Sequence, residues 1–176
     1  MSSPLNQWTN ATTPIAPTGN IILDSLLCDY KAGGAVGTAA VLTYSFPWTT
    51  SGAAVWATNP SYSPLNEPSS GSGLSPAQQA AVRSTMSTWS QVANVQFVEV
   101  PETPDSVGDI RVGWTRLSNQ LLDAWTWQSP DFHASASDIW LSSPRMGGRP
   151  DSDWQPGGFI KVTLIHELGH VLGLSH

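Results

Sequence analysis

The fold of this chain is decided by residues 166–176, which read HELGHVLGLSH. Side chains four apart on an α-helix lie one above the other, so His166 and His170 can bind one metal ion from a single helical face. Glu167 lies about 100° further round the helix, close enough to reach a water molecule beside the metal without binding the metal itself. Gly173 permits the left-handed turn that ends a helix, after which His176 can return as a third nitrogen ligand. Three imidazoles that leave a fourth position open predict a catalytic zinc site rather than a structural one.

The motif is specific enough to outweigh a purely structural explanation. Five fixed positions, three of them the rare residue His, occur by chance in about one in 10⁵ chains of this length at average composition. An amphipathic helix with incidental histidines would require no such spacing. Zinc lowers the pKa of water towards about 7 and polarises a carbonyl group, and Glu167 can take a proton from that water and pass it to a leaving amine. Hydrolysis of this kind needs no Ser or Cys nucleophile.

Hydrophobic periodicity on the N-terminal side of the motif predicts alternating strands and helices. The motif helix is expected over 159–172, and a second long helix over 75–94, where Ser75 is a good cap and Pro76 suits the first helical position. The other expected elements are strands at 39–48, 95–100, 109–114, 121–127 and 138–142, a short helix at 21–30, and surface loops at 49–74 and 143–158. This order predicts a mixed sheet with helices packed on it.

Length, charge and hydropathy limit the class of protein. The 176 residues suffice for one domain with a core, expected at 21–176, while 1–20 read as an extended or disordered leader. A net charge of −6 with only 11% charged residues argues against a nucleic-acid partner, which requires clustered Lys and Arg. No apolar run is long enough to span a membrane, and no classical signal peptide is visible. We expect a monomer with no nucleic-acid or membrane partner.

The spacing HExxHxxGxxH is the metzincin signature, and the chain resembles the serralysin-type metallopeptidases, a family of secreted bacterial enzymes. The resemblance covers roughly residues 18–176, through the segments TGNIILDSLLCDYKAG, VLTYSFPW, LSPAQQAAVRSTMSTWSQVANVQFVEV, GDIRVGW and DIWL. It implies a zincin-like α+β fold, in which a twisted mixed sheet has four parallel strands and one antiparallel edge strand, with two long helices. It also implies zinc-dependent cleavage of proteins or peptides, and an extracellular location.

Individual roles follow from the same resemblance. The three motif histidines would be the zinc ligands and Glu167 the general base. The segment 121–127 would be the antiparallel edge strand, to which an extended peptide adds by main-chain hydrogen bonds, with Ala124 and Trp125 in contact. For the WTW side chains of 125–127 we favour aromatic packing in a core or edge strand over a direct role in binding.

The chain departs from the family at its C-terminal end. It stops at His176, so the turn that carries a Met beneath the zinc, with its lobe, is expected to be missing, and the metallopeptidase domain to be incomplete. The calcium-binding repeats of the family are not found, and Asp151 and Asp153 are interpreted as solvated acids. Without the Met-turn lobe, His176 is expected to fray as a terminus.

Two functions therefore remain open. The first is a zinc-dependent endopeptidase, which the retained Glu167 favours because a pure binding module needs no base. The second is a catalytically incompetent, truncated protease-like module that binds extended peptides at its edge strand. A separate segment that restores the missing wall of the cleft is a third possibility.

Three further features have structural explanations. Cys28 could block the zinc as a thiolate, but its place at the edge of an apolar helical stripe favours a buried, inert thiol. His133 lacks a nearby partner pattern and is expected at the surface. The nine tryptophans are scattered through several elements, which favours core packing over carbohydrate binding.

Overall fold

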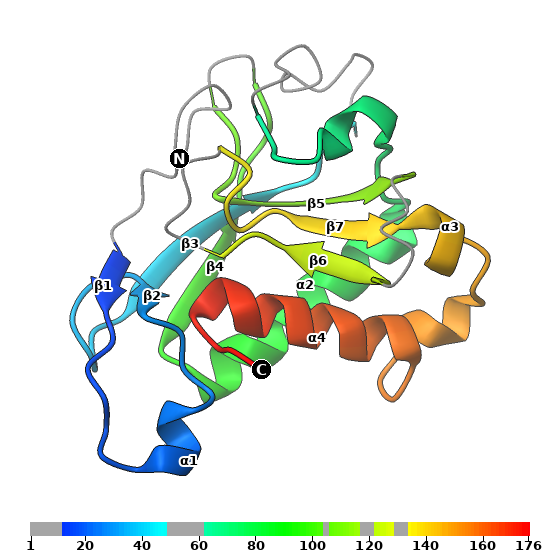
Figure 1. The fold of residues 1–176 in the computed structure, drawn as a ribbon. Helices are drawn as coiled ribbons and strands as arrows, with labels where there is room; N and C mark the ends of the chain where they lie inside the picture. Colours follow the sequence, from blue (N-terminus) through cyan, green and yellow to red (C-terminus); the bar gives the residue numbers. More distant parts are fainter. Residues whose placement is uncertain (1–11, 49–61, 104–105, 117–121, 129–133) are drawn as a thin grey trace.

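The computed structural model describes residues 12–48, 62–103, 106–116, 122–128 and 134–176 (Figure 1). In chain order the elements are β1 (Thr12–Pro14), α1 (Ile21–Asp24), β2 (Tyr30–Ala32), β3 (Ala40–Ser45), η2 (Glu67–Ser70), α2 (Pro76–Val92), β4 (Val95–Glu99), β5 (Ile110–Thr115), β6 (Ala124–Thr126), β7 (Ile139–Ser142), α3 (Ser143–Met146), η3 (Asp151–Trp154) and α4 (Phe159–Leu172). The labels η2 and η3 denote short 3-10 helices.

Five strands form one sheet in the order β4-β3-β5-β7-β6. Neighbouring strands run parallel from β4 to β7, and β6 lies antiparallel to β7 at one edge (Figure 1). The expected α+β fold, with four parallel strands and one antiparallel edge strand, is thereby confirmed. A separate two-stranded sheet pairs β1 with β2.

The two long helices, α2 and α4, pack against each other on one side of the sheet (Figure 1). Helix α2 starts where predicted, because the Ser75 side chain accepts the main-chain N–H of Gln78 while the Gln78 side chain accepts that of Ser75. Val82 and Met86 of α2 and Leu164 of α4 are buried in the main core. Within the described residues, neither of these helices nor any other combines the length and hydropathy needed to cross a membrane.

Aromatic side chains form a second cluster on the other face of the sheet. Tyr62, Trp125 and Trp140 are buried together, and Trp48 and Trp127 pack against them. Successive residues of a strand point to opposite faces, which explains why the neighbours of Trp140 in β7 belong to the main core instead. The described tryptophans of this cluster serve packing, as expected.

The helix expected at 21–30 is wrong beyond its first turn. Helix α1 ends at Asp24, because the main chain that follows finds partners elsewhere: Leu27 pairs with Leu174, and 30–32 form β2. The apolar side chains of this segment do not form a buried stripe, and Ile22 is 71% exposed. Strand β1 also lies within the expected leader, so 12–14 are part of the folded chain, whereas 1–11 lie outside the described residues.

The described parts of the two expected loops contain short helical segments. Within 49–74, residues 49–61 lie outside the described part, but Tyr62 and the acid Glu67 are buried and η2 forms a helical turn. The loop 143–158 contains α3 and η3. The strand expected at 121–127 is reduced to the three residues of β6, and Leu121 lies outside the described residues.

Arg111 of β5 forms a largely buried ion pair with Glu102. Nε and Nη2 of Arg111 donate to the two carboxylate oxygens of Glu102 at 2.8 and 2.7 Å. Nη1 of Arg111 donates to the hydroxyl oxygen of Tyr62 at 3.2 Å, and that hydroxyl donates to Asp138 at 2.7 Å. Asp138 also accepts the main-chain N–H of Arg111 at 3.0 Å. Through these contacts Arg111 of β5 is joined to Asp138, which directly precedes β7, and to Tyr62 of the aromatic cluster.

Candidate metal centre

The C-terminal end of α4 is built to return the chain towards its own helix. Gly173 adopts the left-handed conformation, with φ 105° and ψ 21°. Its N–H donates to the carbonyl of His170, and the N–H of Leu174 donates to that of Gly169, which is the Schellman pattern of helix termination. The glycine predicted from the motif therefore has the expected conformation.

The segment after α1 holds the returning chain in place. The N–H of Cys28 donates to the carbonyl of Gly173, and the N–H of Ser175 donates to the carbonyl of Leu26, both at 2.9 Å. His176 follows directly, so its position is set by two main-chain hydrogen bonds from a segment about 150 residues away in sequence. The sequence did not predict these two hydrogen bonds, which we call the C-terminal clamp. The short apolar run at 21–30 has a helical pattern, and its pairing with the C-terminal turn is visible only in the structure.

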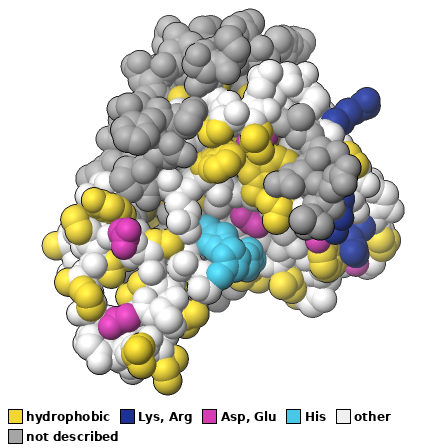
Figure 2. Space-filling view, viewed as in Figure 1, with side chains coloured by type: hydrophobic (Ala, Val, Ile, Leu, Met, Phe, Trp, Pro, Cys, Tyr) yellow, Lys and Arg dark blue, Asp and Glu magenta, His cyan; other side chains and the backbone are white. Residues whose placement is uncertain are grey.

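The three motif histidines converge on one point. Nε2 of His166 lies 3.0 Å from Nε2 of His170 and 3.1 Å from Nε2 of His176. All three ligand nitrogens lie within 4.8 Å of one another. Figure 2 shows these imidazoles as a single exposed patch on the face that α4 presents to solvent. The structure thus brings together the three residues that the sequence singled out.

The tautomer of His170 is fixed by the same C-terminal turn. Its Nδ1 lies 2.8 Å from the carbonyl oxygen of Leu174. A carbonyl only accepts, so Nδ1 carries the proton and Nε2 keeps its lone pair towards the other histidines. Burial and the neighbouring imidazoles of His170 and His176 lower the pKa of His166. The hydrogen bond to Leu174 therefore turns the lone pair of Nε2 of His170 towards the other two imidazoles.

Glu167 follows His166 in α4 and lines, with it, a hollow between α4 and β6. Its side chain is buried, and loss of hydration raises its pKa to about 7, opposed by a hydrogen bond from the main-chain N–H of Thr126. That N–H belongs to the edge strand β6. The candidate base is thus linked directly to the strand on which the sequence analysis expects the substrate.

The pairing of β6 decides which of its main-chain groups face outwards. The carbonyl of Asp123 accepts the N–H of Ser142 on the β7 side at 2.9 Å. Hydrogen-bonded positions alternate along an antiparallel pair, so the main chain of Trp125 also faces β7. The main-chain groups of Ala124 and Thr126 then face the open edge. This pairing leaves the main chain of Ala124 open at the edge and turns that of Trp125 towards β7, and a peptide contact at either residue stays a prediction.

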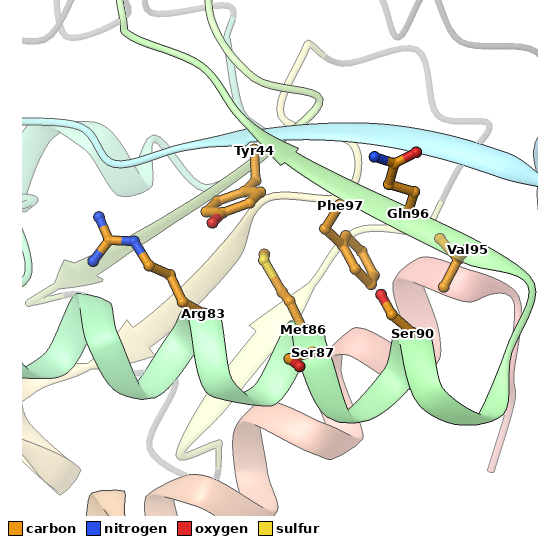
Figure 3. Close-up of a pocket in the computed structure, with 8 residues that line it drawn as sticks. All are labelled: Tyr44, Arg83, Met86, Ser87, Ser90, Val95, Gln96 and Phe97. Carbon is orange, nitrogen blue, oxygen red and sulfur yellow. The ribbon is translucent and has the colours of Figure 1, made fainter.

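A hollow of about 320 Å³ lies between β6 and the first half of α4. It is lined by His166 and Glu167 together with Leu122, Asp123, Ala124, Phe159, Val162 and Thr163. A second hollow, of about 290 Å³, lies between α2 and β4 at the opposite edge of the sheet (Figure 3). Its cationic side chain, Arg83, forms an ion pair with Glu99. Only the first hollow adjoins the histidines.

The edge strand is also held from its other face by a buried acid. Oε1 of Glu67 accepts the indole N–H groups of Trp125 and Trp127, each at 2.9 Å. Sequence reasoning missed Glu67, which stood in a segment read as a surface loop. The sequence did offer one indication of a buried acceptor near β6. Trp125 and Trp127 are two residues apart and so lie on the same face of the strand, and a buried indole N–H requires an acceptor.

The remaining sequence predictions have mixed outcomes. Cys28 is half-buried rather than buried, and its sulfur accepts a hydrogen bond from Gln128 at 3.0 Å. Asp151 is exposed as expected, while Asp153 pairs with Arg149 at 2.6 Å. His133 lies outside the described residues.

Replacing Gly173 by Ala is expected to destabilise the chain and weaken metal binding. A Cβ at this position would lie 2.7 Å from the carbonyl oxygen of Tyr30, on a backbone with φ 105°. We expect a loss of about 1–3 kcal/mol in the free energy of unfolding, measured by urea denaturation, together with weaker zinc binding in a titration. Gly148→Ala is the control, since a Cβ there has no neighbour within 4 Å. Equal stability of the two variants would contradict the role assigned to this turn.

Comparison with known proteins finds a matching family model, related sequences and a similar solved structure. The Peptidase M10 family model, described as matrixin, matches residues 56–176. Serralysin of Proteus mirabilis is 29% identical over 110 residues, covering 56% of this chain and 22% of that protein. Serralysin B of Dickeya chrysanthemi is 29% identical over 145 residues, covering 80% of this chain and 27% of that protein. The solved structure of myroilysin aligns at 19% identity with a TM-score of 0.44, covering 78% of this chain and 49% of the other. The chain spans about a quarter of the length of these two serralysins.

Proposed function

This chain belongs to the matrixin (Peptidase M10) family of metalloproteases, and from that premise we propose that it is a zinc-dependent endopeptidase that hydrolyses peptide bonds of proteins. The observation that carries the proposal is the convergence of three Nε2 atoms next to a buried glutamate. His166, His170 and His176 would hold the zinc, and Glu167 would act as the general base.

The donor set fits zinc. Zinc binds imidazole nitrogen at 2.0–2.1 Å in tetrahedral geometry, which places neighbouring nitrogens about 3.3 Å apart. The two distances of 3.0 and 3.1 Å around His166 are close to that value. The hydrogen bond from Nδ1 of His170 to the carbonyl of Leu174 is the kind of second interaction that orients metal-binding histidines. Three protein ligands would leave one coordination position for water or substrate, which suits a catalytic rather than a structural ion.

When bound, zinc supplies Lewis-acid chemistry: it polarises the scissile carbonyl and lowers the pKa of water towards about 7. The carboxylate of Glu167 would accept the proton of the attacking water and deliver it to the leaving amine nitrogen. The hydrogen bond from the N–H of Thr126 holds this carboxylate at the edge strand. The proton acceptor and the strand that receives the substrate are therefore positioned by one contact.

An extended peptide is the substrate class that this site fits best. The outward main-chain groups of Ala124 can hydrogen-bond to a peptide backbone, whatever its sequence. The adjoining hollow of about 320 Å³ would receive one substrate side chain against Leu122, Phe159 and Val162. Trp125, the other residue expected at this strand, would contribute by fixing the strand through its indole. The resemblance to serralysins supports action outside the cell.

Zinc dependence tests the proposal. The 176-residue chain is expected to bind one zinc ion and to cleave an unstructured protein such as casein only in its zinc-bound form, with activity lost on chelation and restored by zinc. His170→Ala is expected to lower zinc affinity by at least about 100-fold, because it removes a ligand rather than an outer partner. His133→Ala, the change of the one histidine outside the motif, is the matched control.

Two results would overturn the proposal. If His170→Ala and His133→Ala bound zinc equally well, the motif would not be the zinc site. If the chain bound zinc and an extended peptide but left casein intact, the peptide-binding module would be the better interpretation.

A further inference from the structure

We propose that Glu67 is a positioning residue for the substrate-binding edge strand: by accepting both indole N–H groups of Trp125 and Trp127, it fixes β6 where a peptide and Glu167 meet it. The inference rests on the function proposed above, because it assigns the substrate to β6. Nothing in the reaction itself uses Glu67.

The contacts of the Glu67 side chain explain how a carboxyl group can be buried here. The residue is 0% exposed. Its Oε1 accepts the two indole N–H groups at 2.9 Å, and its Oε2 accepts the hydroxyl of Ser63. An indole N–H is a donor only, so both tryptophans depend on this one oxygen. Removal of the side chain would leave two donors without their acceptor in a buried aromatic cluster.

The main chain around Glu67 is anchored to β5, two strands in from the edge. The hydroxyl of Thr115 donates to the carbonyl of Glu67 at 3.0 Å. Ser72 and Trp114 exchange two main-chain hydrogen bonds of 3.0 and 2.9 Å. Glu67 therefore connects the interior of the sheet with its edge, across β7.

The edge strand needs such an anchor. It has three residues and pairs on one side only, with β7. The side chains of Trp125 and Trp127 lie on the face that Glu67 holds, while Ala124 belongs to the core on the α4 side. Thr126, between the two tryptophans, donates its N–H to Glu167. Two buried acids thus hold the same short strand, Glu67 through side chains and Glu167 through the main chain.

This arrangement differs from ordinary core packing in a testable way. A packing defect lowers the fraction of folded enzyme, which reduces apparent kcat without changing KM. A loosened edge strand instead adds an ordering cost to each binding event, which raises KM. The exchange rate of the Thr126 amide reports the same loosening without any need for activity.

The test compares Glu67→Ala and Glu67→Gln in the zinc-bound 176-residue chain. We expect Glu67→Ala to raise KM for an extended peptide on the order of tenfold and to speed exchange of the Thr126 amide at least tenfold. kcat per folded, zinc-bound molecule should fall by a smaller factor. Glu67→Gln keeps an acceptor oxygen and should fall between Glu67→Ala and the parent. Glu102→Gln is the matched control, because it changes an acid, 12% exposed, that contacts Arg111 and not β6; its KM should stay at the parent value.

The possible results of this test either support or overturn the positioning role of Glu67. Parent-like KM and Thr126 exchange in folded Glu67→Ala would overturn the proposal, as would an equal rise of KM in Glu102→Gln. If Glu67→Ala does not fold, the double variant Trp125→Phe/Trp127→Phe replaces it, since it keeps aromatic packing and removes only the two donors. If the parent chain cleaves nothing, the proposed function fails, and the Thr126 exchange rate alone decides whether Glu67 positions the strand.

Discussion

Glu167→Gln is expected to lower kcat for cleavage of an unfolded protein by about 10²–10⁴-fold, the range attributable to a lost general acid–base group. Gln has nearly the same shape and keeps an oxygen that can accept the N–H of Thr126. It cannot take a proton from water at neutral pH. Zinc affinity should therefore stay within a few-fold of the parent value while turnover is lost. The measurements are steady-state cleavage of casein and a zinc titration on the same preparation.

The control for this variant is Glu99→Gln, which changes a half-exposed acid at the opposite edge of the sheet. It should leave kcat and zinc affinity unchanged. Retention of more than about a tenth of the parent kcat by Glu167→Gln would contradict the assigned role, because such a loss is smaller than general-base catalysis provides. Loss of zinc binding by Glu167→Gln would instead show that the carboxylate is needed to build the site.

Much of the candidate site could be read from the sequence because its geometry is local. The three histidines, the glutamate and the glycine all lie within one helix and the turn that ends it, where spacing determines direction. The clamp that holds His176 could not be read in this way. It depends on two main-chain hydrogen bonds that join Leu26 and Cys28 to the C-terminal turn, and such isolated bonds require no particular side-chain pattern.

In the fold, too, local features could be predicted from the sequence, whereas contacts between distant residues could not. The strands of the large sheet alternate strongly and were located to within a few residues, and α4 has the predicted bounds. Burial of acids was not foreseen. Glu67 stands in a stretch rich in Pro, Ser and Asn, and Glu102 stands between Pro101 and Pro104; both stretches resemble solvated loops. Only the folded chain brings these acids to Trp125 and Arg111. Periodicity reports which face of an element is apolar, but not which distant donor makes a buried charge tolerable.

Arg111→Met is expected to cause the largest loss of stability of any single change considered for this chain. The guanidinium is 1% exposed and bonds to both oxygens of Glu102, which is itself 12% exposed. Methionine fills similar space but leaves the carboxylate of Glu102 without its cation and the hydroxyl of Tyr62 without its guanidinium donor. Removal of one partner of a buried ion pair costs about 3–5 kcal/mol, which corresponds to a decrease of roughly 6–20 °C in Tm for a domain of this size. Urea and thermal denaturation followed by circular dichroism measure both quantities.

A matched surface pair separates burial from ion pairing as the cause. Arg83 bonds to both oxygens of Glu99 at 2.6 and 2.7 Å, geometry similar to that of the buried pair, but both side chains are 40% exposed. Water hydrates either partner when the other is removed, so Arg83→Met should cost at most about 1 kcal/mol. The double variant Arg111→Met/Glu102→Gln should recover part of the loss seen in Arg111→Met, because it removes one uncompensated charge. Equal destabilisation by Arg83→Met and Arg111→Met, or no recovery in the double variant, would mean that packing of the arginine stem, rather than its buried charge, stabilises β5.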